Sequence, residues 1–104
     1  MSKVTISAGI CGFTATIIAK NNEDECVDVT FSTTCPNFKK LEKENLEFDP
    51  LVCCFGKLAE NEVFELFKSC CPHPTCPIPT AFLKAIEVEG GLALPKDVIM
   101  TIEK

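Results

Sequence analysis

Apolar and polar residues alternate in three stretches of the first third of the chain. Val4, Ile6 and Ala8 alternate with polar or small residues, and the same period of two recurs at residues 15–19 and 27–32. Such alternation is typical of strands that bury one face. Gly9, Gly12 and the polar turn "NNEDE" separate the stretches, so we predict an antiparallel three-stranded meander with one solvated face.

The apolar spacing becomes helical after the third stretch. A first helix is predicted from Pro36, because proline fits the first helical position, and its inward residues would be Phe38, Leu41 and Leu46. A second helix is predicted from Ala59 through residue 67, and a third from residue 79 or 80 to the glycine pair at 90–91. The last nine residues, "KDVIMTIEK", alternate again and predict a final strand.

This order of elements predicts the fold class. We expect an α+β domain spanning residues 1–104, in which a three-stranded antiparallel meander plus a C-terminal strand carries about three helices on one face. With 46% hydrophobic and 24% charged residues, the chain has ordinary globular composition and needs no cross-links to fold.

Charge and hydropathy narrow the function classes. The net charge is −5 and all ten basic residues are lysines, which argues against a nucleic-acid partner. No window approaches the roughly 18 apolar residues of a membrane span, and the N-terminus lacks the pattern of a secretory signal. We therefore expect a soluble, cytoplasmic protein.

Eight cysteines are the main chemical feature of the sequence. In a cytoplasmic protein they indicate metal binding or catalysis more than disulfides, although buried free thiols are also common. Cys35 and Cys76 each precede a predicted helix and a proline, and Cys11 lies in the first hairpin turn before Gly12. A thiol at the positive end of a helix dipole forms the thiolate more readily, and the thiolate is the form that binds metal or attacks.

The segment "SCCPHPTCPIPTAF" adds three candidate ligands to Cys76. Cys70 and Cys71 close the second predicted helix, and His73 is held on a stiff loop between two prolines. Cys26 is expected to be an exposed thiol without a ligand role. Cys53 and Cys54 follow an apolar pair and are expected to pack, and whether they take part in a site stays open.

The order of these parts resembles the iron–sulfur scaffold family of IscU and NifU N-terminal domains. The resemblance rests on "CGFT" at Cys11, "VDVTFSTTC" at Cys35 and "PHPTCPIPTAFLKAIE" at Cys76. Phe13 stands where that family has an acidic residue, and Thr75 where it has histidine. The chain also resembles TSCPD-type domains and, more narrowly, a group of small cysteine-rich proteins of anaerobic prokaryotes with no assigned function.

The resemblance implies a binding protein more than an enzyme. Cys11, Cys35 and Cys76, with His73, Cys70 or Cys71 as the fourth ligand, would hold an iron–sulfur cluster or Zn²⁺. Its partner would be a protein of sulfur or iron–sulfur metabolism. Two alternatives remain: a thiol redox or sulfur-carrier protein with one activated cysteine, and a structural domain with buried free thiols.

Overall fold

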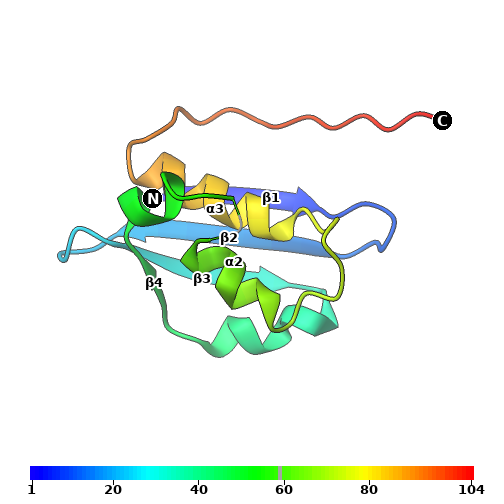
Figure 1. Cartoon of the computed structure of the whole chain (residues 1–104), viewed down its shortest axis with the longest axis horizontal. Coiled ribbons are helices and arrows are strands. Elements are labelled where there is room, and N and C mark those ends of the chain that lie inside the picture. The colour runs from blue at the N-terminus through cyan, green and yellow to red at the C-terminus, as the bar shows by residue number, and fades with distance from the viewer. Residues whose placement is uncertain (59) are drawn as a thin grey trace.

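The three alternating stretches form neighbouring strands of one antiparallel sheet. The computed structural model describes residues 1–58 and 60–104. Its strands are β1 (Ser2–Ser7), β2 (Thr14–Asn21), β3 (Val27–Thr33) and β4 (Leu46–Phe48), and they lie side by side in sequence order (Figure 1). The predicted meander is therefore confirmed, and a short fourth strand extends it.

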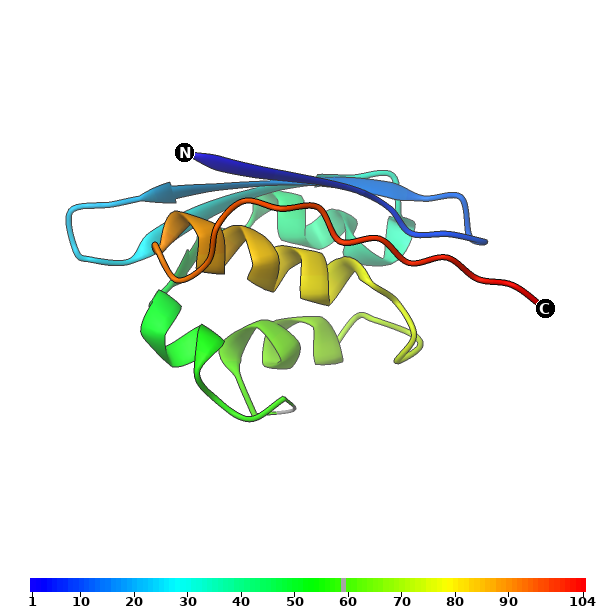
Figure 2. The ribbon, with the colours of Figure 1, turned by 90° about the horizontal axis from the view of Figure 1, so that it is seen from above.

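The strand register explains the alternation of the sequence. Val4 lies opposite Ile17, and Ile17 lies opposite Phe31, so these side chains share one face of the sheet. The helices cover this face, as the view from above shows (Figure 2), and Ile17 and Phe31 are buried there. The intervening residues, such as Thr30, point to the opposite face.

Four helical segments pack on the covered face: η1, a 3₁₀ helix (Pro36–Lys43), α1 (Pro50–Cys54), α2 (Glu62–Lys68) and α3 (Ile78–Glu89). An α+β fold with helices on one face of an antiparallel sheet is thus confirmed. The predicted helix start at Ala59 lies outside the described residues, and the described helix begins at Glu62. No helix in the described ranges has both the length and the apolar character needed to cross a bilayer.

The segment between η1 and α2 differs from the prediction. Leu46 faces the core, but from β4 rather than from a helix, and α1 follows at once. The Asp49 side chain caps α1 by accepting from the backbone N–H of Leu51 at 3.0 Å. The three residues of β4 are too few for alternation to be read as a strand. They are recognisable only from their pairing with β3.

Phenylalanine side chains form the centre of the core. Phe67 of α2 lies edge-on to Phe31, Phe38 and Phe82, with ring centroids 6.1, 5.1 and 5.4 Å apart. Edge-to-face pairs add about 0.5–1.5 kcal/mol each to the gain from burial. The aromatic cluster therefore fixes α2 and α3 to the sheet and to η1.

The predicted C-terminal strand is wrong for the single chain. Residues 92–104 form no strand and run as an extended segment along the β1 side of the molecule (Figure 1). Gly91, with φ of +76°, and Leu92 donate to the carbonyls of Val88 and Glu87, which is a Schellman motif. This motif ends α3 and sets the direction in which the chain leaves it. The alternation is present, but in the part of the chain that the structure describes the segment pairs with no strand.

Candidate thiol site

The loop that carries Cys11 lies at the same end of the sheet as Cys35. Ser7 and Thr14 face each other at the base of the β1–β2 hairpin, and Cys11 lies in the turn beyond them. The backbone N–H of Thr34 donates to the carbonyl of Thr14 at 3.0 Å, so the end of β3 reaches the same edge. Cys35 follows directly and is the N-cap residue of η1, as its position before Pro36 predicts.

The direction of α3 brings Cys76 to this end as well. Glu89, the last residue of α3, accepts hydrogen bonds from Ser2 and Asn21 at the opposite end of the sheet. The first residue of α3, Ile78, therefore lies at the hairpin end, and Cys76 precedes it by two positions. Figures 1 and 2 both show the loop before α3 beside the end of β3.

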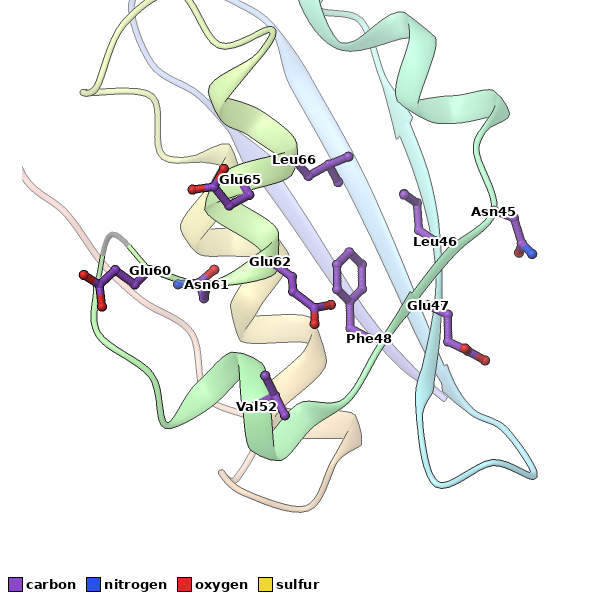
Figure 3. A pocket seen from close by; sticks show the side chains of 10 residues that line it. All are labelled: Asn45, Leu46, Glu47, Phe48, Val52, Glu60, Asn61, Glu62, Glu65 and Leu66. Carbon is purple, nitrogen blue, oxygen red and sulfur yellow. The ribbon is translucent and has the colours of Figure 1, made fainter.

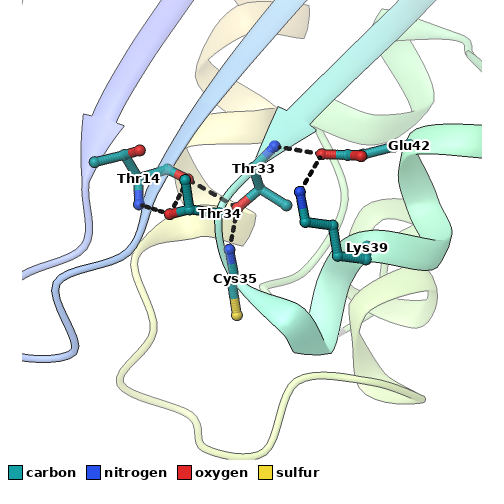
Figure 4. A network of polar contacts seen from close by, with 6 residues as sticks. All are labelled: Thr14, Thr33, Thr34, Cys35, Lys39 and Glu42. Atoms are coloured by element: carbon teal, nitrogen blue, oxygen red, sulfur yellow. Dashed lines mark hydrogen bonds and ion pairs between the residues drawn. The ribbon is translucent and has the colours of Figure 1, made fainter.

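A network of threonines holds the backbone of Cys35 (Figure 4). The Thr33 hydroxyl accepts from the N–H of Cys35 at 3.0 Å and donates to the carbonyl of Thr14 at 2.8 Å. The N–H of Thr33 donates to the Glu42 carboxylate at 2.7 Å, which lowers the pKa of that carboxyl. The sequence signal for this arrangement is "STTC", because threonine hydroxyls bond nearby backbone groups where a strand ends. The predicted site did not include this arrangement.

Cys71 is positioned by the end of α2. Its N–H donates to the carbonyl of Phe67 at 2.7 Å, and its thiol donates to the carbonyl of His73 at 3.1 Å. The first bond ties Cys71 to a core residue, and the second closes the "CPH" turn. Cys71 is half-buried, and its thiol is held against the loop backbone by the bond to His73.

The pKa of the Cys76 thiol is shifted by burial, by the backbone and by two other cysteines. Burial raises the pKa of the Cys76 thiol to about 11, and a hydrogen bond from the N–H of Ile78 opposes that rise. The charge of Cys71 and a hydrogen bond with its thiol add to the rise, as does the charge of Cys35. Cys35, Cys71 and Cys76, which come from three separate parts of the sequence, therefore lie at the same end of the molecule.

The other predicted ligands are placed differently. Cys11 is at the same end of the sheet but exposed on the hairpin. The Cys70 thiol is directed back along α2, where the carbonyl of Leu66 accepts from it at 3.9 Å. His73 is exposed and contributes its backbone carbonyl to Cys71. Across residues 1–58 and 60–104, no three Cys, His, Asp or Glu side chains are already arranged to hold a metal ion.

One comparison with known proteins gives a match. The model of a family of unknown function, DUF6951, matches residues 2–102. The chain belongs to this family. No curated protein sequence and no solved structure matches it.

The remaining cysteines of this DUF6951 protein lie in α1 and before β3, and they are buried or half-buried. Cys53 of α1 is buried, and burial, followed by the charges of Glu62 and Cys54, raises the pKa of its thiol to about 12. Burial likewise raises the pKa of Cys54. Cys26, expected to be exposed, is half-buried before β3, and burial and the charge of Glu47 raise its pKa. Cys53 and Cys54 therefore pack, as predicted.

An open groove of about 780 Å³ lies between β4 and the helices α1 and α2 (Figure 3). Its wall is apolar at Leu46, Phe48 and Val52 and acidic at Glu62 and Glu65. Among the residues that the structure describes, no cysteine or histidine lines it. The groove therefore offers no thiol chemistry, and the chemically distinctive part of the molecule is the cysteine-bearing end of the sheet.

Proposed function

We propose that this protein binds Zn²⁺ or an iron–sulfur cluster through Cys35, Cys71 and Cys76, with Cys11 of the hairpin as the fourth thiol. The observation that supports the proposal is that the start of η1, the residues after α2 and the loop before α3 each carry a cysteine at the same end of the sheet. Packing alone does not require several thiols from distant segments to share one location.

The chemistry of the donors supports a soft or borderline metal. Thiolates select Zn²⁺ and iron–sulfur clusters over hard cations such as Mg²⁺. The N–H of Ile78 points at the Cys76 sulfur, and hydrogen bonds to cysteine sulfur are among the groups that tune iron–sulfur centres. Pro72, Pro74 and Pro77 restrict the backbone of the loop that presents Cys71 and Cys76.

Binding requires two local changes. The Cys71 thiol must turn away from the carbonyl of His73, which gives up one weak hydrogen bond. The Cys11 hairpin must also close over the other thiols. Cys11 lies between Gly9 and Gly12, whose φ angles of +100° and +77° lie in a region that glycine adopts freely. The rest of the site is supported by the threonine network and by α3.

The proposal includes a cytoplasmic location, where thiols stay reduced, and a protein partner in sulfur or iron–sulfur metabolism. Both follow from the cysteine content and from the resemblance to the IscU and NifU scaffold domains. The finer fold relationship to those domains is part of the same proposal.

The test is reconstitution of the reduced protein under anaerobic conditions, once with Zn²⁺ and once with ferrous iron and sulfide. We expect stoichiometric Zn²⁺, or the absorption bands of an iron–sulfur cluster, in the native chain. Cys35→Ser, Cys71→Ser and Cys76→Ser should each lose the bound metal, whereas Cys54→Ser and Cys70→Ser should retain it. Absence of metal from the folded native protein in both reconstitutions would refute the proposal.

A second candidate function is thiol–disulfide exchange between Cys71 and Cys76. The interaction between these two thiols favours it. One thiolate would attack a disulfide of the oxidant and release one oxidant thiolate, which leaves a mixed disulfide. The second cysteine would then attack that mixed disulfide, form the Cys71–Cys76 bond and release the other oxidant thiolate. Titration with oxidised glutathione, followed by peptide mapping, should then give a Cys71–Cys76 disulfide. Exclusively mixed or scattered disulfides would exclude this function.

A further inference from the structure

Strand β1 leaves one side of the sheet open. It is the edge strand of the order β1-β2-β3-β4, and in the described part of the chain it pairs only with β2. Val4 and Ile6 face the helices but are only half-buried, whereas their partners on β2, Ile17 and Ala15, are buried. The core is therefore incompletely covered along its β1 side. An open edge of this kind is a ready site for a further strand.

The C-terminal segment exposes large apolar side chains that a further strand of the sheet would bury. Val98, Ile99, Met100 and Ile102 have exposed fractions of 68, 86, 75 and 85%. Val98, Met100 and Ile102 share one parity, and the other parity holds Asp97, Ile99, Thr101 and Glu103. Large apolar side chains concentrated in one exposed segment mark an interaction surface.

We propose that the C-terminal segment, residues 97–102, pairs with the β1 edge of a second copy of this chain, and that the exchange is reciprocal. The segment and β1 are both six residues long. With Val98, Met100 and Ile102 on the helix side, they would extend the apolar row of Val4 and Ile6. The opposite parity would then place Asp97 on the same outer face as Lys3, so an opposite charge is available there as well.

The direction of the segment favours a second copy over its own β1. It leaves α3 beside Ser2 and runs in the same direction as β1 (Figures 1 and 2). Pairing within one chain would therefore be parallel, which is slightly less stable per residue than antiparallel pairing. In a two-fold dimer with its axis perpendicular to β1, the partner's segment runs antiparallel to β1. A two-fold axis also makes both copies equivalent, so the exchange leaves neither β1 edge open.

The test is the association state of the full chain in a reductant, measured by sedimentation velocity at about 100 μM. We expect a dimer. Met100→Glu should raise the dissociation constant about 100-fold or more, because it would place a carboxylate against the apolar row. Ile99→Glu is the matched control: its side chain is as exposed but of opposite parity, so its effect should stay below about tenfold.

A second measurement locates the contact. Among the two methionines, Met100 can be followed by its labelled methyl group in a mixed sample of labelled and unlabelled chains. Contacts from this methyl group to Val4 or Ile6 of the unlabelled copy are expected. A monomer at this concentration, contacts confined to one chain, or a dimer unaffected by Met100→Glu would overturn the proposal. None of these results depends on bound metal, so the proposed thiol site is tested separately.

Discussion

The reactivity of Cys76 separates the proposed metal-binding function from catalysis by an activated thiol. Burial is the largest cause of the rise in the Cys76 pKa, from an ordinary 9.0 to about 11. At pH 7 this rise lowers the thiolate fraction by about 100-fold. A thiolate of higher pKa is intrinsically more nucleophilic, and a Brønsted coefficient of about 0.4–0.5 returns a factor of about 8. The folded protein should therefore alkylate at Cys76 about tenfold more slowly than the same residue in denaturant.

The assay is pulsed alkylation with iodoacetamide in metal-free buffer, with peptide mapping of Cys76 in folded and denatured protein. Its rate in the folded protein should still rise above pH 9, because the thiol is not yet fully ionised there. Cys71→Ala removes one cause of the raised Cys76 pKa, so it should speed the reaction of Cys76 at pH 7, but by less than the full factor because burial remains. Faster labelling of Cys76 in the folded protein than in denaturant would refute this reasoning and favour an activated nucleophile.

Two further predictions concern the end of α3. A Cβ atom on Gly90 would lie 2.6 Å from the Cβ of Pro50, so Gly90→Ala should lower the free energy of unfolding by about 1–3 kcal/mol. In urea titrations the control Gly56→Ala, whose Cβ would meet its nearest atoms at 3.5 Å, should cost less than about 1 kcal/mol; equal losses would contradict the argument. For Glu89, burial opposes ionisation, but hydrogen bonds from the neighbouring strands, including Ser2, outweigh it and lower the pKa. Glu89→Gln should therefore lower the free energy of unfolding by about 1–3 kcal/mol at pH 7. The difference between the two proteins should vanish as the pH falls below the ordinary carboxyl pKa of about 4.3 and through the lowered pKa of the folded state. A difference that persists in acid would refute the role of the charge.

The sequence predicts the elements whose side-chain period is long enough to be recognised. The first three strands and the α3 helix carry their pattern over six to twelve residues, and the structure forms all of them. The three residues of β4 and the five of α1 carry too little periodicity, although Asp49 before Pro50 is a capping signal. The C-terminal alternation misled for another reason: period two shows that a segment can be a strand, while a partner strand decides whether it is one.

The thiol site was predictable only in part. Helix starts located Cys35 and Cys76, because proline after cysteine fixes where a helix begins. The choice between Cys70 and Cys71 depends on which way each thiol points from the last turn of α2, and adjacent residues of equal chemistry give no sequence signal for that. The turn that holds Cys71 is closed by its bonds to Phe67 and His73, which only the folded loop reveals.

The hydrogen bond from Cys71 to the Phe67 carbonyl links the core to the proposed thiol site. Substitutions of Phe67 therefore test whether core packing positions the Cys71 thiol. Its ring is 1% exposed and lies among three other rings, so Phe67→Ala should lower the free energy of unfolding by about 3–5 kcal/mol. Phe67→Leu, which retains most of the volume, should cost less and leave a folded protein in which the last turn of α2 repacks.

The Phe67 carbonyl accepts from the N–H groups of both Cys70 and Cys71, so a displaced α2 moves the Cys71 thiol relative to Cys76. We therefore expect the folded Phe67→Leu variant to bind Zn²⁺ at least tenfold more weakly than the native chain in a chelator competition. Phe55→Leu is the control. Phe55 follows directly after α1 and is 72% exposed, so this substitution should affect neither the free energy of unfolding nor the Zn²⁺ affinity. Native affinity in a Phe67→Leu variant of clearly lowered stability would show that core packing does not position the thiol.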